Sequence, residues 1–110
     1  MSEHRPRRTT LESYDLEEVE VPLGDAGQNI RAIKITIHGE NIFLRALEPT
    51  VRIGDTEVLH PRIEPDERTI VGYLTDQPQE GAAIQLEYRG QEPVVLPERF
   101  TMSKLGRRPG

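Results

Sequence analysis

Apolar and polar residues alternate along several segments of the chain, and a period of two is the pattern of a strand with one buried face. The clearest run is 33–38, where Ile33, Ile35 and Ile37 are separated by polar side chains. If these isoleucines face the core, then His38 and the polar residues between them face the solvent. Shorter runs predict further strands at 18–21 (Glu18 to Val21), 51–53 (Val51 to Ile53) and 84–88 (Ile84 to Tyr88).

Two other segments depart from simple alternation. Segment 68–74 is apolar on both faces, which predicts a central strand, and its Gly72 predicts a close approach by another part of the chain. Segment 94–102 follows Pro93 and contains Pro97. Because proline in sheets is confined to edges and bulges, we expect an edge strand with a bulge there.

Turn residues separate these runs. Gly54-Asp55 stands between two short alternating runs and predicts a two-residue hairpin, because glycine takes the positive φ that a tight turn needs. Other corners are predicted at 39–41, 64–67, 76–81 and 89–91. Their spacing is close to that of a sandwich or barrel.

Helices find little support in the pattern. Segment 11–18 begins like a helix capped by Thr10, but the valines and the proline of 19–22 favour extended structure. Segment 42–47 is shorter than two helical turns, and 9 prolines and 9 glycines are spread along the chain. We therefore expect an all-β, antiparallel sandwich of about seven strands.

Charge is distributed unevenly over the 110 residues, whose formal net charge is -5. Residues 11–102 hold 8 basic and 18 acidic residues, net -10, whereas residues 1–10 carry net +2 and residues 103–110 net +3. The length fits one domain, so we expect a single sandwich at 11–102 between two flexible basic tails. An acidic body repels phosphate backbones, which argues against a nucleic-acid partner.

The basic tails supply the candidate binding residues that the charge pattern singles out. Arginine pairs bidentately with phosphate and carboxylate groups, so the tails could contact an anionic partner. The alternative is that they only keep flexible termini in solution. The candidate anion contacts are Arg5, Arg7, Arg8, Arg107 and Arg108, with Lys104 beside the second group.

Composition removes several classes of chemistry. The chain has 0 cysteines, which excludes a disulfide framework, a thiolate zinc site, an iron–sulfur cluster and a cysteine nucleophile. No apolar run near the N-terminus resembles a secretory signal, and no stretch approaches the length of a membrane-spanning helix. We expect a cytoplasmic protein without a membrane partner.

The order of the motifs resembles that of IPT/TIG domains, which are immunoglobulin-like sandwiches. Segment 33–42 resembles their opening I-x-I-x-G-x-N-hydrophobic motif, and segment 51–58 resembles their short hairpin. Later segments are similar to the remaining family strands, and the resemblance covers roughly residues 19–102. These later segments are 66–71, 81–88 and 96–100.

Two features depart from the family pattern. Pro78 comes later than the proline that commonly follows the strand at 70, and the link 42–47 is more apolar than expected. The resemblance implies an immunoglobulin-like, non-enzymatic domain. Such domains serve as spacers, as protein-contact modules, as the dimerising half of some transcription factors and as accessory domains of sugar-processing enzymes.

The serines and histidines of the chain do not form the patterns typical of a nucleophilic site or a metal site. The serines are Ser2, Ser13 and Ser103, all in or near the tails, and no G-x-S-x-G motif is present. The histidines at 4, 38 and 60 lack the i, i+2 or i, i+4 spacing that aims two rings at one metal. We expect solvent-facing histidines, with no catalytic residue, metal or cofactor.

Acidic and aromatic residues leave two alternatives open. Glu18 and Glu20 project to one side of a strand and could hold Ca²⁺, although a solvated face that protects a sheet edge is the simpler interpretation. Sugar binding needs exposed aromatic platforms; Tyr73 is either exposed or fills the second face of its strand. The residues expected in the core are Phe43, Tyr88 and Phe100.

The function predicted from these patterns is a non-catalytic, immunoglobulin-like module for protein interaction or assembly. It would use a sheet face or a free edge strand to bind a protein partner or its own copy as a homodimer. The alternative is an accessory module that binds carbohydrate or an anionic ligand. A third hypothesis is a small enzyme with an acidic site.

Overall fold

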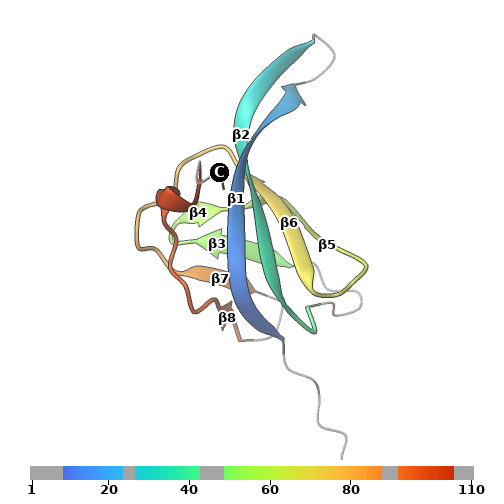
Figure 1. Cartoon of the computed structure of the whole chain (residues 1–110), viewed down its shortest axis with the longest axis vertical. Coiled ribbons are helices and arrows are strands. Elements are labelled where there is room, and N and C mark those ends of the chain that lie inside the picture. The colour runs from blue at the N-terminus through green and yellow to red at the C-terminus, as the bar shows by residue number, and fades with distance from the viewer. Residues whose placement is uncertain (1–8, 24–26, 43–48, 88–91, 106–110) are drawn as a thin grey trace, which may run out of the picture.

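The chain folds into two antiparallel β-sheets that pack as a sandwich, as the computed structural model shows for residues 9–23, 27–42, 49–87 and 92–105 (Figure 1). Sheet A has the order β1-β2-β6-β5 and sheet B the order β4-β3-β7-β8. The strands of sheet A are β1 (Thr10–Leu23), β2 (Gln28–Glu40), β6 (Thr69–Leu74) and β5 (Leu59–Ile63). The strands of sheet B are β4 (Thr56–Glu57), β3 (Thr50–Ile53), β7 (Ile84–Glu87) and β8 (Val94–Val95), and a short 3-10 turn, η2 (Met102–Lys104), follows them.

This strand order is that of the immunoglobulin fold. Its A-B-E-D sheet corresponds to β1-β2-β6-β5, and its C-F-G sheet corresponds to β3-β7-β8, with β4 added at the edge. The prediction of an all-β antiparallel sandwich is therefore confirmed. The described residues form eight strands rather than about seven, because β5 was not expected as a strand. Its residue His60 has a φ of 52°, and the register shifts between Leu59 and Arg62.

The alternating isoleucines face the core as predicted. Ile35 and Ile37 of β2 are 0% and 1% exposed, and they lie opposite Gly72 and Ile70 of the central strand β6. Burial of each such side chain contributes about 1.5–3 kcal/mol. The other core residues are Leu11, Tyr14, Leu16, Ile42, Val51, Ile53, Val58, Leu74, Ile84, Leu86, Leu96 and Phe100.

Two glycines have the roles that the sequence predicts. Gly54 has a φ of +61° in the turn between β3 and β4, where Ile53 pairs with Thr56. Gly72 lies against the segment between β4 and β5, and a Cβ at this position would collide with Cγ1 of Val58. The absence of a side chain at Gly72 therefore lets β5 pack closely against β6.

The two segments considered for a helix and the expected last strand have different outcomes. Segment 11–18 is part of β1, a 14-residue strand, which agrees with the expectation of an all-β fold. Of the second candidate helix, 42–47, residues 43–47 lie outside the described residues. The expected edge strand at 94–102 is a strand only at β8, although the backbone N–H groups of Leu96 and Phe100 still donate to Ile84 and Ala82.

Tyr14 links β1 to the C-terminal segment. Its hydroxyl donates to the carbonyl of Arg99 at 3.0 Å and accepts from the backbone N–H of Thr101 at 2.8 Å. The Phe100 ring stacks on the Tyr14 ring with 6.2 Å between centroids, and Lys104 Nζ lies 3.9 Å from the centre of the Tyr14 ring. These contacts fix the chain after β8 against the first strand of the other sheet.

Candidate functional site: a groove on the outer face of sheet A

The predicted anion contacts fall outside the part of the chain that the structure describes, since Arg5, Arg7, Arg8, Arg107 and Arg108 belong to residues 1–8 and 106–110. Their neighbour Lys104 is described. Its ammonium group donates to the Tyr14 carbonyl at 2.6 Å and to Glu98 Oε1 at 2.8 Å. Lys104 is thus already engaged in holding the C-terminal segment against β1.

The predicted solvent position of His38 is confirmed, and the structure adds a partner that the sequence did not reveal. His38 Nε2 lies 2.9 Å from Asp15 Oδ2, with both side chains substantially exposed. Ser13 lies opposite His38 in the β1–β2 register, but these described residues share no serine–histidine hydrogen bond. The pair is an exposed surface contact, without the positioned hydroxyl of a nucleophilic site.

The two glutamates considered for Ca²⁺ have neighbours of their own. Glu18 Oε2 lies 3.5 Å from Arg31 Nη1, and Glu20 Oε1 accepts from the Asn29 side chain at 3.5 Å. Within the described ranges, no group of three histidine or acidic residues is arranged to hold a metal ion. Among the aromatic residues expected in the core, Phe100 is 1% exposed, which confirms its position, and Phe43 and Tyr88 lie outside the described residues.

The apolar residues of the β1–β2 hairpin change face along its length. Near the base, Leu16 and Tyr14 of β1 face the core opposite Ile35 and Ile37. Farther out, the apolar positions of β1 are Val19 and Val21, which have the opposite parity. Because successive side chains alternate across a strand and no register shift lies between 16 and 21, the two valines face the outer side of sheet A.

The same change of face occurs in β2, in register with β1. Val19 lies opposite Ala32, and Val21 lies opposite Ile30. Ala32 is only 4% exposed, yet it does not belong to the core cluster. The hairpin extends beyond the sandwich (Figure 1). Its outer positions there are apolar, whereas the positions of opposite parity, on the side that continues the core, include the charged residues Glu18, Glu20 and Arg31.

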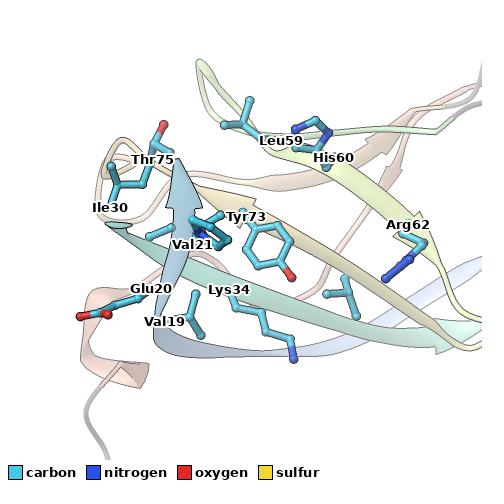
Figure 2. Close-up of a pocket in the computed structure, with 13 residues that line it drawn as sticks. Val19, Glu20, Val21, Ile30, Lys34, Leu59, His60, Arg62, Tyr73 and Thr75 are labelled. Atoms are coloured by element: carbon cyan, nitrogen blue, oxygen red, sulfur yellow. The ribbon is translucent and has the colours of Figure 1, made fainter. Parts of the chain in front are cut away.

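This apolar face forms one wall of a groove of about 630 Å³, and strands β5 and β6 form the other (Figure 2). Leu59 of β5 is 40% exposed, and Tyr73 of β6 is half-buried between Leu59 and Lys34, its cross-strand neighbours. The lining residues are Val19, Glu20, Val21, Pro22, Ile30, Ala32, Lys34, Leu59, His60, Arg62, Val71, Tyr73 and Thr75.

The groove has an apolar end and a polar end. Val21 and Ile30 lie toward the tip of the hairpin, whereas Lys34, the hydroxyl of Tyr73 and Arg62 lie toward the opposite end (Figure 2). The side chain of Lys34 has no ion-pair or hydrogen-bond partner among the described residues. The groove thus combines an apolar surface with the side chains of Lys34, Arg62 and Tyr73, and Glu20 and His60 also line it.

The sequence alone left it open whether the Tyr73 side chain is exposed or buried, and it did not predict the groove. The signal was present in the parity of the apolar positions, which are even-numbered at Tyr14 and Leu16 but odd-numbered at Val19 and Val21. A change of parity inside one uninterrupted strand indicates that its apolar residues line two different faces.

Comparison with family models, with curated proteins and with solved structures gives no significant match to this chain. No helix in the described part of the chain has the length and apolar character needed to cross a bilayer.

Proposed function

We propose that this chain is a non-catalytic, immunoglobulin-like protein-interaction module, similar in motif order to IPT/TIG domains, and that it docks a protein partner on the outer face of sheet A. The observation that supports the proposal is the in-register change of face in β1 and β2. In an antiparallel sheet with one solvated face, the outer positions are normally polar. Here Val19, Val21 and Ile30 occupy outer positions at the groove.

Apolar surface on a solvent-facing sheet has a thermodynamic consequence. Removing it from water stabilises a complex by about 25 cal/mol per Å² of apolar area, before the costs of association. Contiguous apolar surface that is exposed to solvent marks interaction sites in folded proteins. In the groove, Val19, Val21 and Ile30 are partly exposed and Leu59 is 40% exposed, so a partner that covers the groove gains from their burial.

Affinity capture with matched variants tests this function. The wild-type chain and the variants Val21→Asp and Val95→Asp are immobilised and exposed to extract from the native host. Val95 lies on β8 of sheet B and is 52% exposed, so Val95→Asp places the same charge at an exposed position away from the groove. We expect at least one protein that wild type and Val95→Asp retain and Val21→Asp loses, and that binds again when purified. Equal retention by both variants would contradict the proposal.

An accessory module that binds a small anionic ligand is a second candidate, because Lys34 and Arg62 lie at one end of the groove. The volume of about 630 Å³ lies within the range of small-molecule sites. A thermal-shift panel of sugars, carboxylates and phosphates separates the two functions. A shift of several degrees that disappears in Lys34→Met favours the small ligand over the protein partner.

A further inference from the structure

We infer that the groove takes an extended segment of the partner protein in which alternate residues are apolar, apolar and acidic. This inference rests on the proposed function and specifies the chemistry of the partner. It follows from the order of side chains along β2 and from the charges at the polar end of the groove.

The spacing of β2 sets the spacing of the subsites. Ile30, Ala32 and Lys34 are alternate residues of one strand, and all three line the groove. Alternate residues of a strand project to the same side and lie about 6.6–6.8 Å apart. An extended segment that follows β2 has the same repeat, so its alternate side chains meet these three positions in succession.

Apolar side chains on the neighbouring strands also surround the positions at Ile30 and Ala32. Val21 lies opposite Ile30, and Val19 lies opposite Ala32, so each of the first two positions has an apolar neighbour on β1. Leu59 contributes from the facing wall and is among the most exposed large apolar side chains of the described residues. Two successive apolar residues of the partner are therefore accommodated at the hairpin end.

The third position selects an anion. Tyr73 lies directly opposite Lys34 on β6, and Arg62 lies opposite Val71 on the same face of the sheet. The Lys34 ammonium group has no described partner, although Glu17 occupies the opposite position on β1. Among the described residues, the side chain of Arg62 has one exposed ion pair, with Glu64 Oε2 at 3.8 Å from its Nε.

One carboxylate can use all three donors at this end of the groove. Lys34 and Arg62 supply charge-assisted hydrogen bonds, and the Tyr73 hydroxyl has no hydrogen-bond partner within the described ranges. The body as a whole is strongly acidic, with net charge -10 over residues 11–102, so it repels a segment with many acids. A single acidic residue at the third alternate position meets both conditions.

Selection from a random peptide library displayed on phage tests the inference. The targets are the full chain, the double variant Lys34→Glu/Arg62→Glu and the control Arg52→Glu. Arg52 lies on β3 of sheet B, where it contacts Glu87 at 3.7 Å. We expect the full chain and the control to enrich the pattern apolar-x-apolar-x-acid, and the double variant to enrich a basic residue at the third position. Thermal melts confirm that each variant is folded.

A selected peptide then serves to measure how much the acid at the third alternate position contributes to binding. We expect replacement of its acid by the amide to weaken binding about tenfold, and Lys34→Met to weaken it by a similar factor. The two changes together should cost little more than either alone, because they remove the same interaction. Independent losses would place the acid elsewhere and overturn the inference.

Other outcomes of the peptide selection would also contradict the inferred apolar-x-apolar-x-acid pattern. No common pattern, or the same acidic pattern on the double variant, overturns the inference. If light scattering shows a dimer of the full chain that the double variant abolishes, the occupant is a second copy and the inference is again wrong. Host-protein capture that still depends on Val21 would leave the proposed function standing in each case, so the two failures are distinguishable.

Discussion

The hydroxyl of Tyr14 accepts a hydrogen bond from the backbone N–H of Thr101 across a sequence separation of 87 residues. The same hydroxyl donates to Arg99, so one oxygen satisfies two backbone groups of the C-terminal segment. Because this segment forms only the two-residue strand β8, it has few ladder hydrogen bonds of its own. Tyr14 therefore compensates for the short last strand by joining it to the first.

Removal of this hydroxyl should destabilise the fold. In Tyr14→Phe, the N–H of Thr101 and the carbonyl of Arg99 lose their partner, and we expect the free energy of unfolding to fall by about 1–2 kcal/mol. Urea denaturation followed by circular dichroism measures the change. Tyr73→Phe is the matched control, since its hydroxyl has no described partner, and it should leave the free energy nearly unchanged. Equal losses in the two variants would contradict this role.

Stability should also decline at alkaline pH through the same residue. Burial raises the pKa of Tyr14 above its usual value of 10.0, and the N–H of Thr101 only partly offsets this effect. A raised pKa in the folded state favours the protonated form. The resulting contribution is complete below the unfolded pKa and is lost as the pH rises through the folded pKa.

The difference between wild type and Tyr14→Phe isolates this effect, because the other groups that titrate at alkaline pH are present in both proteins. We expect the advantage of wild type in urea titrations to shrink as the pH is raised from 9 toward 12. An advantage that stays constant over this range would show that the pKa of Tyr14 does not differ between the two states.

A side chain at Gly72 should strain the contact between β6 and the segment that precedes β5. The Cβ of Gly72→Ala collides with Cγ1 of Val58 and lies 3.3 Å from the carbonyl oxygen of Leu59, so we expect a loss of about 1–3 kcal/mol. In Val58→Ala/Gly72→Ala the colliding methyl group is gone. The double variant should therefore lose about 1 kcal/mol less than the sum of the single variants in a thermodynamic cycle. Additive losses would mean that the strain arises elsewhere.

Asp66 should make the turn before β6 sensitive to acid. Its carboxylate accepts from the N–H of Arg68 at 2.8 Å and from the Thr69 hydroxyl at 2.9 Å, and these bonds hold its pKa below the usual 3.8. The contribution of a depressed pKa is present above the unfolded value and is lost as the pH falls through the folded value. Asp66→Ala should lower the urea midpoint slightly at pH 6, and the difference should shrink as the pH falls below 3.8. Asp76→Ala, in an exposed turn, is the control.

Much of the sandwich was predictable because the alternation of side chains and the turn residues determine strands and turns locally. The parity of Ile33, Ile35 and Ile37 specifies one buried face, and the turn at Gly54 requires the positive φ that glycine allows. In contrast, β5 contains Pro61 and a histidine with positive φ, and neither favours a strand. It becomes one only because β6 offers a free edge and Gly72 permits a close approach, which are long-range conditions.

The candidate site was harder to predict for a related reason. Alternation at 18–21 indicates a strand but does not say which of its faces is buried, and this depends on the partner residues of β2. Tyr14 posed the same problem, since its hydroxyl is satisfied by residues near the other end of the chain. Both features depend on pairings that only the folded chain defines.

The inward apolar side chains of the β1–β2 hairpin and the outward ones that line the groove lie on one ladder, so the place at which the register shifts decides which of them face the core. An extra residue inserted between Leu11 and Tyr14 can be absorbed by the existing shift of register at Leu11/Ser13. The same insertion between Leu16 and Val19 would turn both valines toward the charged side and remove the apolar surface proposed for binding. Because the core residues of β1 lie on the other side of this insertion, a single added amino acid would separate the proposed binding surface from the scaffold that carries it.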